Sequence, residues 1–241
     1  MLSVIIPTYN NTDLCLVHVR ESMNSLKIPE EIVVINDGGD IGLRDKLFKL
    51  PKKTKIVYAR IHQDILWNYH GAINLGIWLS RGDFVTLEDV DHIPLHDAYS
   101  NALAVFAEYP ELSRVGWRRQ WVPKADVLNK PFEEWQPYGG LGTNAMVAMY
   151  RRDLLLDMKG GDERMRNYGW LAYCFKARMT KLGAKATNVN GFYIIKDGEE
   201  PGLQRPMSVL NRKIYRENAN RDHVHGEDGI LNYQFTVERW N

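Results

Sequence analysis

The stretch DFVTLEDVDHIP, residues 83–94, places an apolar run directly before three carboxylates and a proline. The apolar part is typical of a buried β-strand, which the proline cannot extend. Asp89 and Asp91 are two positions apart, so in extended backbone both side chains would project to one face while Val90 projects to the other. Two carboxylates directed at one point repel each other unless a cation lies between them. The stretch predicts a strand that ends at a cation site, with a solvated acidic turn as the alternative.

The residues before this stretch alternate between strand and helix patterns. Short apolar runs predict strands at 2–6, 31–35 and 55–58. One helix is expected over 12–26 with Asn11 or Thr12 as its N-cap. A second helix has its apolar face at Ala72, Leu75, Gly76 and Leu79 and is closed by Gly82. Repeated β-α-β units predict an α/β fold in which helices flank a mostly parallel central sheet.

Polar residues follow three of the predicted strands, at 7–10, 36–38 and 88–91. In parallel sheets, the carboxyl ends of the strands share one edge, and ligands bind beyond that edge. The three clusters are therefore expected to lie close together and to form the functional site.

The pattern is looser after residue 110. We expect a helix that starts near Pro94 and an irregular segment over 114–142. The further expected elements are a strand at 145–150, a helix at 163–182 closed by Gly183, a strand at 191–196, a helix at 206–218 and a strand near 231–237. The predicted organisation is one domain over 1–196, with a nucleotide-binding half (1–110) and an acceptor half (111–196), and a C-terminal extension over 197–241 that packs on it.

Composition limits the class of protein. The chain has 241 residues, of which 44% are hydrophobic and 25% charged, and its net charge is +1. These values are ordinary for a globular protein and give no global field that would attract nucleic acid. Cys15 and Cys174 are too few for a disulfide framework, so a reducing, cytoplasmic compartment is expected. No run is long and apolar enough to span a membrane.

The acids suggest a specific chemistry. Mg²⁺ and Mn²⁺ prefer carboxylate oxygens, and proteins often complete their coordination with water and substrate phosphates. Such an ion would act as a Lewis acid when a diphosphate departs. The predicted ligand is therefore a nucleoside diphosphate that carries a transferable group.

Several ordered motifs resemble glycosyltransferase family 2, whose fold is called GT-A. The motifs are SVIIPTYN (3–10), EIVVINDGGD (31–40) and GAINLGIWLSRGDFVTLEDVD (71–91). Within and after them, WNYHGAINLG (67–76), DVDHIPLHDAY (89–99) and DGILNYQFTV (228–237) are similar to the animal β-1,4-galactosyltransferases. The resemblance implies a metal-dependent transferase that takes its sugar from a nucleotide-sugar, most simply a UDP-hexose, and passes it to a hydroxyl of a saccharide or another acceptor.

The resemblance also implies roles for individual residues. Asp37 would accept a hydrogen bond from the uracil or the ribose, and Asp91 would be the firm ligand of Mn²⁺ or Mg²⁺. Asp89 would contact the ribose or the metal. The residues implied to hold the nucleotide are Pro7, Thr8, Tyr9, Asp37, Trp67, Asn68 and Asp89.

The chain departs from the family where the general base is expected. Inverting relatives carry a Gly-Glu-Asp stretch there, but Leu171 and Ala172 stand at the two acidic positions, and neither can take a proton. The nearby Asp162 and Glu163 are the alternative candidates, provided that one reaches the acceptor hydroxyl. Their other interpretation is helix capping and a favourable contact with the helix dipole.

The chain also departs from the family at the third metal ligand. Relatives often supply a histidine near the position of Lys196, which cannot ligate while protonated. His225, with His223 beside it, would replace that ligand if the C-terminal segment folds back. His92 and His96 lie four residues apart, but Pro94 between them argues against a zinc-protease helix.

Aromatic residues suggest where an acceptor would bind. Trp117, Trp121 and Trp135 lie in the segment expected to be irregular, where they could form a platform for a saccharide or pack in the core. The GGLGTN stretch at 139–144 lacks the lysine of a phosphate-binding loop.

The prediction is an inverting, metal-dependent glycosyltransferase. Its alternatives are a retaining enzyme, a protein that binds nucleotide-sugars without turnover, and, more distantly, a nucleotidyltransferase.

Overall fold

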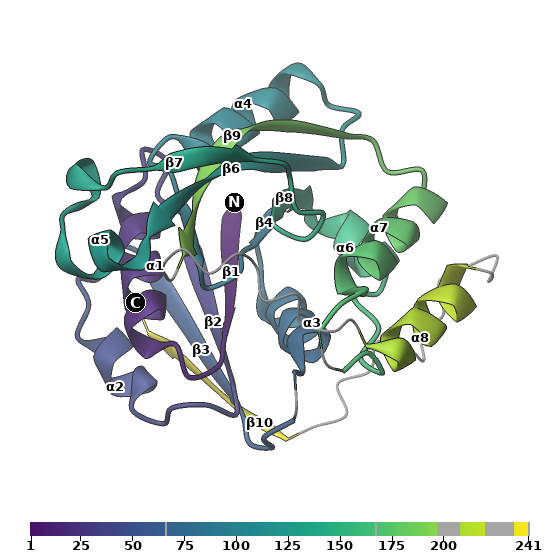
Figure 1. The fold of residues 1–241 in the computed structure, drawn as a ribbon, viewed down its shortest axis with the longest axis horizontal. Helices are drawn as coiled ribbons and strands as arrows, with labels where there is room; N and C mark the ends of the chain where they lie inside the picture. The colour runs from purple at the N-terminus through teal and green to yellow at the C-terminus, as the bar shows by residue number, and fades with distance from the viewer. Residues whose placement is uncertain (66, 167, 197–207, 220–233, 241) are drawn as a thin grey trace.

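The computed structural model describes residues 1–65, 67–166, 168–196, 208–219 and 234–240. Within them, ten strands form one sheet in the order β10-β3-β2-β1-β4-β8-β6-β9-β5, with β7 paired to β6 (Figure 1). The strands are β1 (Leu2–Thr8), β2 (Glu31–Asp37), β3 (Lys55–Ile61), β4 (Phe84–Leu87), β5 (His92–Pro94), β6 (Arg114–Pro123), β7 (Tyr138–Leu141), β8 (Ala148–Arg151), β9 (Ala186–Lys196) and β10 (Phe235–Trp240). The helices are α1 (Thr12–Asn24), α2 (Leu43–Phe48), α3 (Tyr69–Leu79), α4 (Ala98–Glu108), α5 (Lys124–Asn129), the 3-10 helix η1 (Phe132–Glu134), α6 (Arg152–Asp157), α7 (Leu171–Lys181) and α8 (Val209–Ala219).

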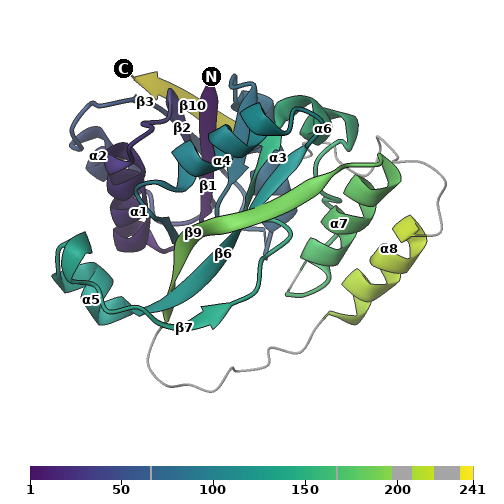
Figure 2. The same ribbon diagram turned by 90° about the horizontal axis from the view of Figure 1, so that it is seen from above.

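The first half of the chain forms the parallel part of the sheet. β3, β2, β1 and β4 lie side by side and parallel, and every residue of β1 and β2 is buried. Figure 2 shows α1 and α2 on one side of these strands and α3 on the other. Helices on both faces explain why the strands are apolar without alternation. The predicted α/β fold is confirmed, although the second half adds antiparallel strands to the sheet.

Close packing of α3 on β1 depends on glycine. A Cβ added at Gly76 would lie 2.3 Å from Cγ2 of Ile5, so the helix approaches the strand where a side chain is missing. The predicted cap at Gly82 is wrong, because α3 ends at Leu79 and its C-cap is Ser80, in extended backbone. A Cβ at Gly82 would instead lie 2.7 Å from the backbone nitrogen of Ser3. Both glycines therefore serve the contact of this segment with β1.

Two predicted helix starts differ from the structure. Pro94 lies in β5, where it pairs with Phe192 of β9, and α4 begins only at Ala98. The helix predicted over 163–182 begins only at Leu171, although Gly183 ends it as predicted, with φ of +66°. At α1, Asn11 occupies the N-cap position, but its amide donates to the Tyr9 carbonyl at 3.0 Å rather than capping the helix.

Much of the segment predicted to be irregular is the long strand β6. It pairs in parallel with β9 and in antiparallel with β8 and β7. Trp117 of β6 is fully buried, and a Cβ at Gly191 of β9 would lie 2.0 Å from its ring, so the glycine makes room for the indole. Pairing with residues far along the chain creates this strand.

The described part of the C-terminal segment packs on the rest of the chain. β10 runs antiparallel to β3, and Glu238 pairs with Arg44 at 2.7 Å. Helix α8 lies against α7 (Figure 2). The predicted strand near 231–237 corresponds to β10, which begins at Phe235, and residues 231–233 lie outside the described residues. The division into two halves and an extension stays a prediction.

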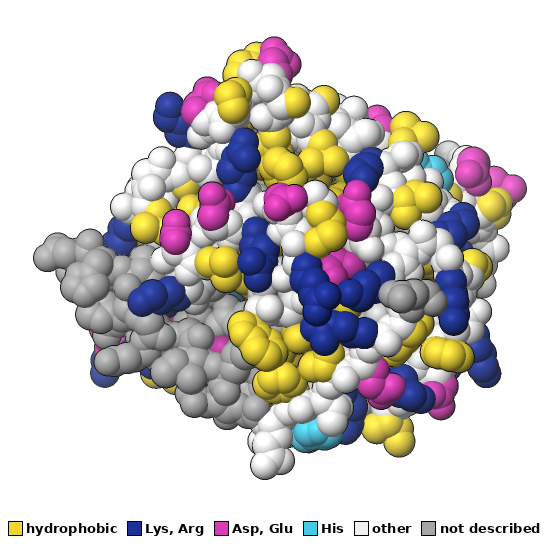
Figure 3. All heavy atoms as spheres, turned by 180° about the vertical axis from the view of Figure 1, so that it is seen from behind, with side chains coloured by type: hydrophobic (Ala, Val, Ile, Leu, Met, Phe, Trp, Pro, Cys, Tyr) yellow, Lys and Arg dark blue, Asp and Glu magenta, His cyan; other side chains and the backbone are white. Residues whose placement is uncertain are grey.

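The surface, the helices and the two cysteines bear on contacts with a partner or a membrane. Seen from behind, Lys and Arg side chains gather near the middle of the molecule beside acidic and apolar ones (Figure 3). Among the described residues, no helix combines the length and apolar character needed to cross a membrane. Cys15 and Cys174 are both buried, free thiols.

Candidate active site

The three polar clusters lie at the same edge of the sheet, as predicted. Thr8 at the end of β1 pairs in register with Asn36 near the end of β2, and Ile5 pairs with Leu87 at the end of β4. Because all three strands are parallel, the residues that follow them emerge on one side. This edge holds the candidate site.

Asp89, Asp91 and His92 form the centre of the site. One ligand atom from each lies within 4.8 Å of the other two. The segment is a turn rather than the extended chain we expected, and the backbone N–H of His92 donates to the Asp89 carbonyl at 2.8 Å. The turn, followed directly by β5, brings His92 beside the two acids, so the cluster contains a histidine that the sequence did not nominate.

Neighbouring side chains hold the two carboxylates. The Tyr69 hydroxyl, at the start of α3, donates to Oδ1 of Asp89. Nδ1 of His92 lies 2.7 Å from Oδ1 of Asp91, and Nη1 of Arg119 on β6 lies 2.8 Å from Nε2 of His92. Asp89 is thus held by a residue of α3, and Asp91 by its neighbour His92, which Arg119 of β6 contacts in turn.

The same neighbours shift the pKa values of the cluster. Burial raises the pKa of Asp89, with the charge of His92 opposing it. Burial also disfavours the charged form of Asp91, but His92 outweighs it and lowers the pKa of that carboxyl. Burial lowers the pKa of His92, yet the two carboxylates produce a net rise.

The cluster fits a divalent cation. Two carboxylates within 4.8 Å of each other offer the oxygen ligands that Mg²⁺ and Mn²⁺ prefer. Asp91 is half-exposed, with 47% of its side chain accessible, so an ion and its substrate could reach it. Asp89 and Asp91 are the residues that would hold the ion.

Asp37 and Asn68 form a second polar group at this edge. The Asn68 amide donates to Oδ1 of Asp37 at 2.9 Å, and Nη1 of Arg166 donates to the other end of the same amide. Burial raises the pKa of Asp37 to about 6, with the Asn68 hydrogen bond and the Arg166 charge opposing the rise. The carboxyl group is therefore poised to change its charge in mildly acidic solution.

The other residues implied to hold a nucleotide surround this pair. Pro7 and Thr8 are buried at the end of β1, whereas Tyr9 is exposed with its hydroxyl 3.4 Å from a carboxylate oxygen of Asp64. Trp67 is 38% exposed and has a φ of +52°, a backbone conformation that is rare outside glycine. Its ring contacts Tyr168 edge-on, with 5.8 Å between the ring centroids.

Asp162 and Glu163 lie in a loop that packs against α3. Asp162 is fully buried and accepts hydrogen bonds from Arg164 and Asn218, each as short as 2.7 Å. Burial opposes ionisation of Asp162, but these hydrogen bonds outweigh it and lower its pKa. Glu163 is 6% exposed, and its Oε1 accepts from Asn74 of α3 at 2.9 Å. Asp162 is thus paired with an arginine, while Oε1 of Glu163 is held by the amide of Asn74.

Asn74 fixes the loop that carries these acids. Its side chain accepts from the Gly161 N–H at 2.8 Å and donates to the Gly161 carbonyl at 2.9 Å. The neighbouring His70 faces the same loop, with Nδ1 3.0 Å from the Asp162 carbonyl. Neither residue was nominated from the sequence, since their loop partners lie nearly ninety positions away.

Several nominated residues fall elsewhere. Leu171, the position predicted to correspond to the family's first acid, is buried in the main core. Trp117 and Trp135 are also buried and cannot form a saccharide platform, while Trp121 is partly buried against Tyr138. His223, His225 and the side chain of Lys196 lie outside the described residues, so these ligand predictions stay predictions.

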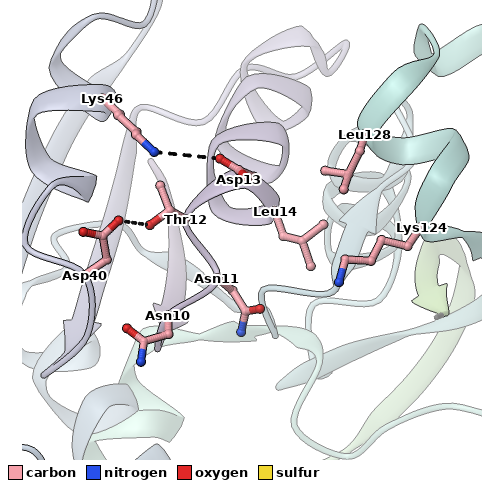
Figure 4. Close-up of a pocket in the computed structure, with 9 residues that line it drawn as sticks. All are labelled: Asn10, Asn11, Thr12, Asp13, Leu14, Asp40, Lys46, Lys124 and Leu128. Carbon is pink, nitrogen blue, oxygen red and sulfur yellow. Dashed lines mark hydrogen bonds and ion pairs between the residues drawn. The ribbon is translucent and has the colours of Figure 1, made fainter.

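A cavity of about 350 Å³ lies beside the start of α1 (Figure 4). In it, the Thr12 hydroxyl bonds to Asp40, and Lys46 lies 3.9 Å from Asp13. The lining residues are Asn10, Asn11, Thr12, Asp13, Leu14, Asp40, Lys46, Lys124 and Leu128. None of the metal-cluster residues is among them, so this cavity is distinct from the cluster.

Comparison with solved structures identifies the fold class as that of GT-A glycosyltransferases. The TarS structure from S. aureus matches with a TM-score of 0.62 at 15% identity over 80% of this chain and 60% of that one. TarS in complex with UDP matches with a TM-score of 0.63 at 17% identity, over 81% and 60% of the two chains. The mannosyltransferase PcManGT from Pyrobaculum calidifontis, in complex with GDP-Man and Mn²⁺, matches with a TM-score of 0.59 at 18% identity, over 83% and 58%. The chain thus spans about three fifths of the length of these structures.

The family is established by the sequence itself. Residues 3–170 match the profile of Glycosyl transferase family 2, and the chain belongs to this family. A search of curated proteins found no match to the chain.

Proposed function

We propose that the chain transfers a hexose from a UDP-linked sugar to a hydroxyl of a saccharide or another acceptor, with Mn²⁺ or Mg²⁺ held by Asp89 and Asp91. The observation that carries this proposal is the Asp89, Asp91 and His92 cluster, which lies at the same sheet edge as Asp37. Family membership supports it, as do the similar structures, of which TarS binds UDP and UDP-GlcNAc and PcManGT binds GDP-Man and Mn²⁺.

In this proposal, each group of residues has one task. Asp37 and Asn68 bind the base or the ribose, with Pro7, Thr8, Tyr9 and Trp67 around them and residues 111–196 supplying the acceptor side. When bound, the cation supplies the charge that stabilises the departing diphosphate. The oxygen of the acceptor hydroxyl bonds to the anomeric carbon from the side opposite the diphosphate as the bond to the diphosphate breaks, which inverts the configuration, and the hydroxyl proton passes to a carboxylate. The likeness of residues 67–76 and 89–99 to β-1,4-galactosyltransferases nominates galactose or glucose.

Binding of UDP-glucose is expected to weaken as the pH falls through about 6. Asp37 is the best hydrogen-bond acceptor when ionised, and its pKa is raised to about 6 by burial. If only the ionised form binds, the dissociation constant should rise about tenfold between pH 7.5 and pH 5. Isothermal titration of wild type and Asp37→Asn measures this. The variant should bind weakly with no step near pH 6, and an identical step in both proteins would contradict the assignment.

Glu163 is the proposed base rather than Asp162. The hydrogen bonds from Arg164 and Asn218 lower the pKa of Asp162, which makes that carboxylate a weak base. Glu163→Gln keeps the size and the acceptor oxygen and is expected to lower kcat about a hundredfold or more with little change in melting temperature. Asp162→Asn is expected to lower the melting temperature, because Arg164 then loses its buried ionic partner.

The same two variants can also contradict the assignment of Glu163 as the base. If Glu163→Gln turned over sugar donor at the wild-type rate, Glu163 would not be the base. A large loss of kcat in a normally folded Asp162→Asn variant would assign the role to Asp162 instead.

The second candidate is a protein that binds nucleotide-sugars without turnover. It is favoured by the buried Leu171 and by Ala172 at the family's acidic positions. Assays of UDP-sugar hydrolysis with Mn²⁺ distinguish the two candidates. The melting temperature of a protein that only binds the sugar donor should rise when the donor is added, but no UDP should be released. If product forms, NMR of its anomeric proton distinguishes inversion from retention.

A further inference from the structure

A chain of hydrogen bonds leads from the end of β7 to the metal cluster. Nε of Arg119 donates to the Gly142 carbonyl at 3.0 Å, and Nη1 of the same guanidinium lies 2.8 Å from Nε2 of His92. Nδ1 of His92 then lies 2.7 Å from Oδ1 of Asp91. The chain thus joins β6 and the residues after β7 to one of the proposed ligands.

The chemistry of the guanidinium fixes the direction of these hydrogen bonds. An arginine side chain has N–H donors and no acceptor. Nε2 of His92 must therefore accept from Arg119, and the proton of the neutral ring lies on Nδ1, from which it is donated to Asp91. Nε2 of His92 lies 2.8 Å from Nη1 of Arg119, so this contact fits a ring whose Nε2 carries a lone pair.

This tautomer leaves neither nitrogen of His92 available to an ion. The Nδ1 lone pair is absent because that atom is protonated, and the Nε2 lone pair is used by Arg119. His92 is only 5% exposed, so packing restrains the ring from turning. The half-exposed Asp91 would otherwise be free to adopt several rotamers.

We propose that His92 is a positioning residue that orients Asp91, that Arg119 sets its tautomer, and that the chain offers only oxygen ligands from this cluster to the ion. The proposal deepens the proposed function and rests on it for the presence of the ion. Mutation of a residue that hydrogen-bonds to a metal ligand in this way commonly lowers the affinity for the metal about ten- to a hundredfold.

The tautomer is tested in the metal-free protein. In ¹⁵N-histidine-labelled protein at alkaline pH, above the raised pKa of His92, NMR should show His92 protonated on Nδ1 and not on Nε2. The His92→Asn variant assigns the signal. A ring protonated on Nε2 would overturn the proposal, whether or not the protein proves to be a transferase.

The coordination is tested with Mn²⁺ alone. Pulsed EPR of the labelled wild type should show bound Mn²⁺ without a directly coordinated histidine nitrogen. A nitrogen coupling that disappears in His92→Asn would make His92 a ligand and refute its positioning role. Failure of the wild type to bind Mn²⁺ would refute the proposed function and remove the ion from this inference.

Matched variants separate the roles further. Asn at position 92 can still donate from the δ position, so His92→Asn should bind Mn²⁺ close to wild type, whereas His92→Leu should bind about ten- to a hundredfold more weakly. Arg119→Met should also weaken binding, and Arg118→Met, at the exposed neighbour on β6, should not. Equal losses in His92→Asn and His92→Leu would contradict the proposal.

Discussion

Asp91→Asn is expected to reduce Mn²⁺-dependent consumption of a UDP-sugar by about a thousandfold or more in kcat/KM. The amide is nearly the same size as the carboxylate and can still accept from His92, so the fold should be kept. It carries no charge, however, and the site then loses cation-derived stabilisation worth several kcal/mol at the transition state.

Two measurements give this prediction a control. Mn²⁺ should raise the melting temperature of the wild type, because it binds only the folded form, and should leave that of Asp91→Asn unchanged. Asp97→Asn, at an exposed position just before α4, makes the same chemical change away from the cluster and should behave as wild type. An Asp91→Asn protein that consumed UDP-sugars at the wild-type rate would refute the assignment of Asp91 as a metal ligand.

The sequence predicts the parallel half of the molecule well because its signals are local. β1 and β2 are apolar runs, each followed at once by polar residues. Parallel strands share an edge, so the position of Asp37 relative to Asp89 and Asp91 followed from the order of the elements. The site could therefore be located from the sequence before any side-chain geometry was known.

The second half of the sheet is less predictable because distant pairing creates it. The end of β6 carries Arg118, Arg119 and Gln120, a polar run that predicts no buried strand, yet it is paired along its length with β9. The contact between Arg119 and His92 depends on this pairing. No local pattern in the sequence could have placed those two residues together.

The polar side of α3 shows the same limitation. Residues Ala72, Leu75 and Leu79 predict one buried face, which is confirmed. His70 and Asn74 are also buried, because the loop of residues 160–163 packs against the face that the pattern left to solvent. A polar residue on a helix can thus be a structural anchor whose partner only the fold reveals.

Asn74→Leu is expected to lower the free energy of unfolding by about 3 kcal/mol. The change removes the hydrogen bonds to both the N–H and the carbonyl of Gly161, and each buried polar group that loses its partner costs about 1–3 kcal/mol. The loop cannot simply move closer to compensate. Gly160 has a φ of +63°, and a Cβ there would lie 2.0 Å from Oδ1 of Asn74, so the contact is already tight.

Urea unfolding followed by circular dichroism measures this loss as a shift in midpoint. Asn101→Leu, on the exposed face of α4, is the matched control and should change stability by less than about 0.5 kcal/mol. Because the loop also carries Glu163, turnover by Asn74→Leu should fall even where the protein remains folded, while stabilisation by Mn²⁺ at Asp89 and Asp91 should persist. An unchanged midpoint would show that the loop is held by contacts other than Asn74.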